Sequence, residues 1–311
     1  ILNPVNVTSL NVSTVTEFIL LGFSFPTNLA PALFFIILLA YVLIVAGNIL
    51  IIGLYCTSQG LHIPMYFFLC NLAIADTIST NVILPVLLVG IIKHSYKLSV
   101  ASCLAQGYLY YFAGVAQFFL LDVMCYDRYL AVCYPLRYPL IMHTKICIVL
   151  VTGVWFSSFL INLSPSVLIM ALSFCFNKIN HFFCDVGPLL QNSCYDTSSS
   201  LQLLLHLNSG LLFFSLMVIV ISYGNIVKEV CKLHSAEAKK VVSTCLSHAL
   251  VVTLFFGSCI FMYVKPVQNQ GSDDYDKKAA VLSTVAVPLV NPYIYTLRNQ
   301  IVRNILKGNQ R

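Results

Sequence analysis

Seven long apolar stretches constrain the fold of this chain more than any other feature of its sequence. A helix that crosses about 30 Å of hydrocarbon needs about 20 mostly apolar residues. A segment exposed to lipid must also satisfy its own backbone hydrogen bonds, which favours a helix. We therefore expect seven membrane-spanning helices, at Pro31–Tyr55, Pro64–Ile92, Val100–Leu121 with a continuation to Cys133, Ile146–Ala171, Leu201–Val227, Val241–Val264 and Ala279–Leu297.

The composition agrees with a chain that is solvated by lipid. Of its 311 residues, 59% are hydrophobic and 9% are charged, whereas a soluble domain is roughly half apolar and about 25% charged. So few charged residues cannot cover the surface of a soluble protein of this length. The chain has no long hydrophilic segment, which predicts one domain without an appended enzyme. Four prolines inside the expected spans predict kinks: Pro85, Pro165, Pro288 and Pro292.

The distribution of charge predicts the orientation in the membrane. The side that carries the C-terminus holds 11 of the 17 Lys and Arg residues. The side that carries the N-terminus holds the other six, together with six acidic residues. Because basic residues accumulate on the cytoplasmic side, the N-terminus should be outside. This predicts an extracellular tail at 1–28, a membrane domain at 29–297 and a cytoplasmic tail at 298–311. The net charge of +6 then faces anionic membrane lipid and needs no nucleic-acid partner.

Two N-glycosylation sequons lie in the short polar N-terminus, at Asn6 and Asn11. Glycosylation occurs on the lumenal side of the membrane, which agrees with an outer N-terminus. A third match, at Asn162, lies inside an expected span and is not expected to be used. No cleavable signal peptide is recognisable, so the first span is expected to direct membrane insertion.

Four of the 12 cysteines fall on the expected outer side, at Cys103, Cys175, Cys184 and Cys194. Four cysteines allow three disulfide connectivities, and the sequence alone does not choose among them. The other eight lie in spans or on the inner side, where free thiols are expected. A zinc site at His181 and Cys184 is the alternative, and a disulfide at Cys184 would exclude it.

Ionisable residues inside the spans are functional candidates, because a charge at mid-bilayer costs about 2.5–3.5 kcal/mol. Asp76 and Asp122 lie deep in spans, whereas Asp127 and Arg128 lie near the inner end of the third. The adjacent Asp127 predicts an ion pair for Arg128, and a snorkelling arginine is the alternative. A transporter or channel should show several midplane charges or repeated halves, and remains a remote alternative. No catalytic motif such as Gly-x-Ser-x-Gly is present, so an enzyme is not expected.

Four strings along the chain stand out: LHIPMYFFLCNLAIAD at Leu61–Asp76, MCYDRYLAVCYPLRYP at Met124–Pro139, STCLSHALVV at Ser243–Val252 and PLVNPYIYTLRN at Pro288–Asn299. They resemble the signature of the vertebrate olfactory receptors, which are rhodopsin-like G-protein-coupled receptors. Gly47-Asn48, Trp155 and Ser222-Tyr223 agree with the same signature. The Asp-Arg-Tyr and Asn-Pro-x-x-Tyr elements are typical of the whole superfamily, whereas PMYFFL and Ser-Thr-Cys-x-Ser-His are more specific. The resemblance covers nearly the whole chain.

The resemblance implies an odorant receptor at the plasma membrane, in olfactory cilia. A ligand would shift a two-state helix bundle through its differential affinity for the active state. The active state would then engage a stimulatory, olfactory-type G protein and raise cyclic AMP, and no cofactor is implied. The residues that match the family's coupling and activation positions are Asp127, Arg128, Tyr129, Tyr223, Asn291, Pro292 and Tyr295.

The resemblance also implies two disulfides, Cys103–Cys184 and Cys175–Cys194. It implies a mid-membrane polar cluster near which a sodium ion can bind, formed by Asn48, Asp76, Gln117 and Asn291. Gln117 stands where most members carry Glu, which removes a negative charge and weakens the sodium expectation. Asp122 is unusual for the family. The segment at 298–308 resembles a short amphipathic helix on the inner membrane surface.

Pocket positions of the family predict a ligand site between the third, fifth, sixth and seventh spans. Spacings of three and four place each group near one helical face, although simple helix packing gives the same pattern. No Asp or Arg faces this site from the third or sixth span, so we expect a small neutral, mostly apolar ligand. A non-olfactory metabolite or lipid is the alternative. The positions are Tyr110, Tyr111, Gly114, Val115, Phe118, Leu207, Phe256, Cys259, Tyr263 and Thr284, with Tyr110 or Tyr263 offering a hydroxyl.

Overall fold

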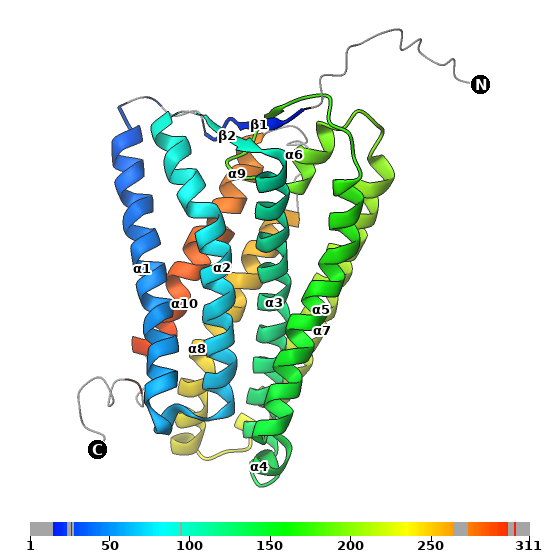
Figure 1. The fold of residues 1–311 in the computed structure, drawn as a ribbon. Helices are drawn as coiled ribbons and strands as arrows, with labels where there is room; N and C mark the ends of the chain where they lie inside the picture. Colours follow the sequence, from blue (N-terminus) through cyan, green and yellow to red (C-terminus); the bar gives the residue numbers. More distant parts are fainter. Residues whose placement is uncertain are drawn as a thin grey trace.

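The computed structural model shows a bundle of long helices with a small β-sheet across one end (Figure 1). It describes residues 15–23, 26, 28–93, 95–263, 273–297 and 302. The two N-terminal sequons lie outside these residues, and so does the expected short C-terminal helix except for Val302.

Six of the described helices are each long and apolar enough to cross a membrane. A seventh crossing consists of three consecutive pieces, α9 (Asp273–Val281), the π-helical η3 (Leu282–Ala286) and α10 (Val287–Leu297). The seven expected spans are therefore confirmed, with small shifts at their ends. The six single helices are α1 (Ala30–Thr57), α2 (Pro64–Lys93), α3 (Val100–Cys133), α5 (Thr144–Met170), α7 (Ser198–Val230) and α8 (Ser235–Tyr263).

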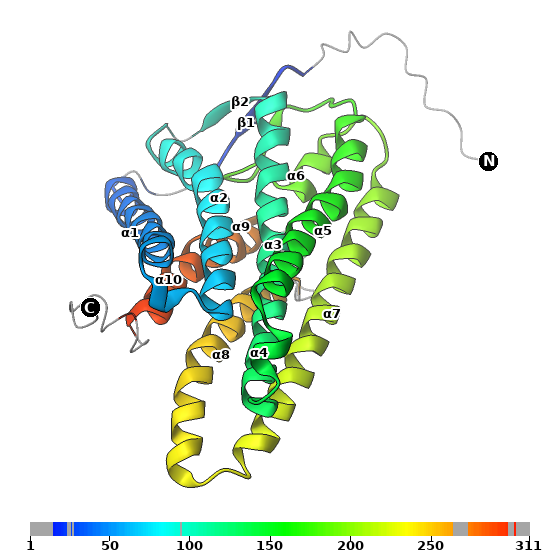
Figure 2. The ribbon, with the colours of Figure 1, turned by 60° about the horizontal axis from the view of Figure 1, so that its bottom comes forward.

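The helix α3 occupies the middle of the bundle, where it packs against α2, α5 and α7 (Figures 1 and 2). The helix α1 packs against α2 and α10. Large apolar side chains on the outward faces of α1 and α7 are exposed, which suits a surface that is covered by lipid. Examples are Phe35, Ile36, Leu39, Phe213, Phe214 and Val220.

One helix contact is unusually close. A Cβ atom placed on Gly47 of α1 would lie 2.7 Å from Cβ of Pro292 in α10. Only a residue without a side chain allows this approach, so Gly47 sets the distance between the first and last helices of the bundle.

The small sheet joins three segments that are far apart in the sequence. Its strands are β1 (Glu17–Leu20), β2 (Tyr96–Ser99) and β3 (Lys178–Ile179), in the order β2-β1-β3. β1 is antiparallel to β2 and parallel to β3. The sequence predicts helices alone, because strands of four and two residues are too short to show a periodic pattern.

The two ends of the bundle carry different elements. The sheet end carries β1, β2 and β3, and α3 begins there, directly after β2. The Arg128 end is the opposite one, where α3 ends and the short helix α4 (Tyr138–Ile141) follows (Figure 1). A further short helix, α6 (Val186–Gln191), lies at the sheet end, and η1 (Gln59–Leu61) lies between α1 and α2.

Candidate functional site

Three of the four residues of the expected polar cluster make direct contact in the middle of the bundle. Asp76 of α2 is only 2% exposed. Its Oδ1 accepts a hydrogen bond from the Gln117 amide of α3 at 2.8 Å, and its Oδ2 accepts one from the Asn291 amide of α10 at 3.1 Å. This cluster therefore connects three helices through one carboxylate. The fourth residue, Asn48, is buried, but its Nδ2 has no hydrogen-bond partner among the described residues.

The Asp76 carboxylate is occupied by amide donors in the structure, and the sodium ion that the resemblance implies stays a prediction. Hard cations are bound by sets of oxygen ligands, whereas here two amide N–H groups point at the carboxylate. The described residues also contain no group of three or more His, Cys, Asp and Glu side chains that could hold a metal.

Asp122 has a partner on a different helix. Its Oδ2 accepts a hydrogen bond of 2.7 Å from the Ser215 hydroxyl of α7. The side chains of Asp122 and Gln117 thus point to opposite neighbours of α3, as a separation of five residues along a helix requires. Asp122 does not take part in the Asp76 cluster, and it connects α3 to α7 instead.

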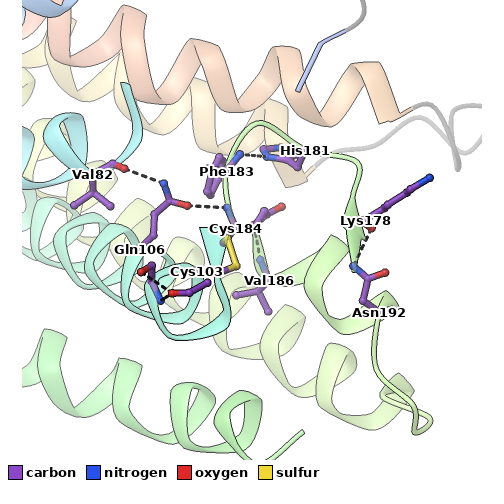
Figure 3. The surroundings of a disulfide bond; sticks show 12 residues. Val82, Cys103, Gln106, Lys178, His181, Phe183, Cys184, Val186 and Asn192 are labelled. Carbon is purple, nitrogen blue, oxygen red and sulfur yellow. Dashed lines mark hydrogen bonds between the residues drawn. A yellow bond between two sulfur atoms is a disulfide. The ribbon is translucent and has the colours of Figure 1, made fainter. Parts of the chain in front are cut away.

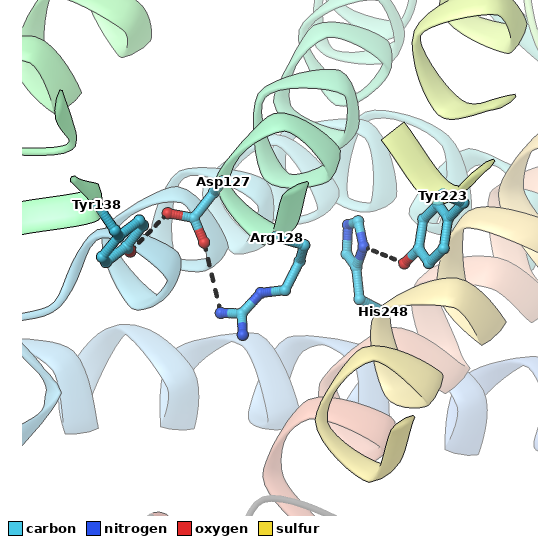
Figure 4. Close-up of polar contacts among 5 residues, drawn as sticks. All are labelled: Asp127, Arg128, Tyr138, Tyr223 and His248. Atoms are coloured by element: carbon cyan, nitrogen blue, oxygen red, sulfur yellow. Dashed lines mark hydrogen bonds and ion pairs between the residues drawn. The ribbon is translucent and has the colours of Figure 1, made fainter. Parts of the chain in front are cut away.

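The predicted ion pair at the Arg128 end is present. The Arg128 guanidinium lies 3.5 Å from Oδ2 of Asp127 (Figure 4). The Tyr138 hydroxyl of α4 donates a hydrogen bond of 2.8 Å to the other oxygen of this carboxylate. Burial, and next the nearby Asp127 carboxylate, raise the pKa of Tyr138 above its usual value, so Tyr138 keeps its proton and remains a donor. Asp127 therefore connects Arg128 of α3 to the short helix α4 that follows it.

A second polar contact at this end joins α7 to α8. The Tyr223 hydroxyl lies 2.7 Å from Nδ1 of His248 (Figure 4). Tyr295 of α10 is buried, and its hydroxyl has no hydrogen-bond partner among the described residues. The expected coupling residues thus come from α3, α7 and α10, and His248 of α8 joins them as a residue that the sequence analysis did not select.

Two disulfides fix the loop between α5 and α7, and they have the pairing that the resemblance implied. Cys103 at the start of α3 is bonded to Cys184 (Figure 3), and Cys175 is bonded to Cys194. The Cys184 N–H also donates to Oε1 of Gln106 at 3.0 Å. Cys184 is therefore not a thiolate ligand, which removes the zinc alternative.

A column of expected ligand-site residues runs along one face of α3, starting near the sheet end. Tyr111, Gly114 and Phe118 follow one another at helical spacing. The Phe118 ring contacts Phe255 and Phe256 of α8, with ring centres 5.0 and 5.2 Å apart. A Cβ atom on Gly114 would meet no heavy atom within 4 Å. Gly114 thus leaves open space between the Tyr111 side chain and the aromatic rings where Phe118 contacts α8.

The polar end of this column includes a carboxylate that the sequence analysis missed. The Tyr111 hydroxyl donates a hydrogen bond to Oδ1 of Asp185, which follows the disulfide-bonded Cys184. We expected no Asp to face the site from the third or sixth span, and Asp185 belongs to neither span. The sequence does not show that the loop between α5 and α7 folds back onto α3.

The remaining expected ligand positions are less uniform. Tyr110 packs against Phe183 of the loop, with ring centres 4.9 Å apart, and Thr284 donates its hydroxyl proton to the Ala280 carbonyl. Val115 and Cys259 are buried, whereas Leu207 is 44% exposed. The structure describes the backbone of Tyr263 and not its side chain. The structure therefore brings Phe118 of α3 and Phe256 of α8 into contact, whereas Leu207 of α7 is exposed.

Comparisons with known proteins agree with this architecture. Residues 47–295 match the family described as 7 transmembrane receptor (rhodopsin family). The chain is 44% identical to olfactory receptor 6E1 of Mus musculus, over 96% of each chain. It is 42% identical to olfactory receptor 6S1 of Homo sapiens, over 95% of this chain and 90% of that receptor.

A solved structure shows the same fold at low sequence identity. Squid rhodopsin superposes with a TM-score of 0.74 and 17% identity, over 92% of this chain and 82% of that one. The family match, the relatives and the long apolar helices together make the protein a multi-pass membrane protein from a family of receptors rather than enzymes. The chain belongs to the rhodopsin family of seven-transmembrane receptors and, within it, to the olfactory receptors.

Proposed function

We propose that this receptor binds a small, mostly apolar odorant beside α3, near the sheet end, and activates a stimulatory, olfactory-type G protein at the Arg128 end. The consequence is a rise in cyclic AMP. The observation that carries the proposal is the column from Tyr111 to Phe118, in which Gly114 leaves space above an aromatic contact with α8.

The proposed orientation places the sheet end outside the cell and the Arg128 end in the cytoplasm. Both disulfides lie at the sheet end, and disulfides persist in oxidising compartments. The excess of Lys and Arg on the opposite side supports the same orientation. It makes 1–28 an extracellular tail with glycans at Asn6 and Asn11, and 298–311 a cytoplasmic helix and tail. The proposed location is the plasma membrane of olfactory cilia.

The contact between α3 and α8 supports a route from ligand to G protein. A ligand beside Gly114 would touch Phe118, whose ring packs on Phe255 and Phe256. The helix that carries these two rings also carries His248, which is hydrogen-bonded to Tyr223 near Arg128. A ligand that binds better when α8 has moved would therefore shift the population towards a state with altered contacts at Arg128.

The affinity should be modest. A ligand of about 12 heavy atoms that gains about 0.5 kcal/mol per atom has a binding free energy of about −6 kcal/mol, or a Kd of tens of micromolar. Screening should therefore extend to about 100 μM.

The test is a cyclic AMP reporter in cells that express this receptor with an olfactory-type stimulatory G protein. A panel of neutral volatile compounds is applied to wild type, to Arg128→Ala and to Lys97→Ala. Lys97 is exposed in β2 at the sheet end, so its variant removes a positive charge far from the proposed coupling site. We expect a response that is lost in Arg128→Ala and kept in Lys97→Ala, at matched surface expression.

Other outcomes would contradict the proposal. A response that survives in Arg128→Ala would show that Arg128 does not couple the receptor to its G protein. Silence of wild type across the panel, with confirmed surface expression, would reject an odorant ligand or the stimulatory G protein.

A further inference from the structure

We infer that Asp185 makes the polar end of the ligand site an acceptor of hydrogen bonds, and that the receptor therefore selects alcohols. It would prefer an alcohol over an ether of the same carbon skeleton, and it would reject the corresponding carboxylic acid. This inference rests on the proposed ligand site and names the chemical class that the site takes.

The hydrogen bonds around Asp185 define this acceptor character. Oδ1 of Asp185 accepts from the Tyr111 hydroxyl and from the backbone N–H of Val186, the latter at 2.9 Å. A tyrosine hydroxyl has a single proton, and here Tyr111 directs that proton at the carboxylate. What the Asp185 carboxylate can still offer a ligand is therefore oxygen lone pairs.

The second oxygen of Asp185 is available in the described part of the chain. Its Oδ2 accepts no hydrogen bond there. The ion pairs among the described residues are Asp127–Arg128 and Lys232–Glu229, and neither includes Asp185. A carboxylate without a paired cation attracts a donor and repels an anion.

Asp185 is also held in a fixed position. It follows Cys184, which is bonded to Cys103 of α3 and whose N–H donates to Gln106. Its side chain caps the N-terminus of α6. The loop at this point packs directly on α3, because a Cβ atom on Gly107 would lie 3.1 Å from the Cys184 carbonyl oxygen. A fixed acceptor discriminates between ligands because it cannot turn away from the wrong one.

The rest of the column suits an apolar body attached to such a hydroxyl. From Tyr111 to Phe118, α3 rises by about 10 Å, at 1.5 Å per residue. Open space lies beside Gly114, and the aromatic contact of Phe118 with α8 closes the end of this space away from Tyr111. The Thr284 hydroxyl donates its proton to the Ala280 carbonyl at 2.7 Å, so Thr284 supplies no donor for a ligand carbonyl.

An alcohol can donate a hydrogen bond to the Asp185 carboxylate. An ether oxygen has no proton to donate, so it can make no hydrogen bond to this carboxylate. A hydrogen bond to a charged group is strong enough to change affinity at least tenfold. We therefore expect wild type to respond to an alcohol at about one tenth of the concentration that its methyl ether needs.

The experiment compares matched compounds across several skeletons: an alcohol, its methyl ether and the corresponding carboxylic acid. The cyclic AMP response of wild type is compared with that of Asp185→Asn and Asp196→Asn. Asparagine caps a helix about as well as aspartate, so Asp185→Asn keeps the start of α6 while it removes the charge and adds a donor. Asp196 accepts hydrogen bonds from Ser198 in the same loop region, which makes its variant a matched control.

We expect the preference of wild type for alcohols to fall to within about threefold in Asp185→Asn and to persist in Asp196→Asn. Equal potency of alcohol and ether in wild type would overturn the inference and leave the proposed function standing. An unchanged preference in Asp185→Asn would do the same. If Asp185→Asn fails to reach the surface, the selectivity of wild type alone still decides. Silence towards every compound would overturn the proposed function as well.

Discussion

Replacement of Gly47 by alanine should destabilise the bundle, although alanine favours a helix. The added Cβ would lie 2.7 Å from Cβ and 3.1 Å from Cγ of Pro292. Carbon atoms in contact are normally about 3.5–4.0 Å apart. The helices α1 and α10 would therefore have to separate by about 1 Å, and the surrounding contacts would be lost or strained.

The magnitude follows from two opposing effects. Overpacking of a well-packed site costs about 1–3 kcal/mol, whereas a change from glycine to alanine inside a helix gains up to about 1 kcal/mol. Gly53 of the same helix provides the control, because a Cβ atom there would meet no heavy atom within 4 Å. Gly53→Ala has the propensity gain without the clash, so the two variants should differ by the overpacking cost.

The assay is thermal unfolding of the purified receptor in one detergent, with wild type, Gly47→Ala and Gly53→Ala side by side. We expect Gly53→Ala to unfold at or above the midpoint of wild type and Gly47→Ala to unfold several degrees lower. A Gly47→Ala midpoint equal to that of Gly53→Ala would refute the reasoning, because it would show that α1 and α10 do not need this close approach.

Three further variants test other contacts. Asp122→Ala removes the acceptor of the buried Ser215 hydroxyl and should cost about 1–3 kcal/mol of stability, whereas Asp122→Asn keeps an acceptor oxygen; equal thermal midpoints for the two would contradict this. Tyr138→Phe removes a hydrogen bond to Asp127 and should raise basal cyclic AMP a few-fold, and an unchanged basal level would show that this bond does not restrain Arg128 at rest. Cys175→Ser opens a disulfide that spans 19 residues and should cost about 3 kcal/mol, seen as lower surface expression or an earlier thermal transition; wild-type values for both would count against a stabilising role.

The seven spans could be predicted from the sequence because lipid leaves so few alternatives. A long apolar stretch in lipid must form a helix, and each stretch of about 20 residues is long enough for one crossing. The contact of Asp76 with Gln117 and Asn291 could be expected from the resemblance alone, since the three residues come from different helices. Arg128 and Asp127 could be paired directly, because they are neighbours in the chain.

The features that could not be predicted depend on how the segments between the helices fold. Asp185 becomes part of the candidate site only because its loop returns to α3, and no local pattern encodes that return. Ser215 is one of many small residues on α7, and its role as the partner of Asp122 depends on how α7 faces α3. The strands of the sheet are shorter than any periodicity that a sequence reveals.

The same sheet has a consequence for how the protein is made. β1 is synthesised first, and β3 follows 158 residues after its last residue, since Leu20 ends one strand and Lys178 begins the other. At a synthesis rate of about 5–20 residues per second, β3 is made about 8–30 s after β1. α1 and α2 lie between β1 and β2, and α3 and α5 lie between β2 and β3. All three strands reach the same side of the membrane because two helices cross between β1 and β2 and two more cross between β2 and β3. Formation of the sheet therefore depends on correct insertion of the first half of the receptor, and a missed crossing would leave β1 with an unpaired edge.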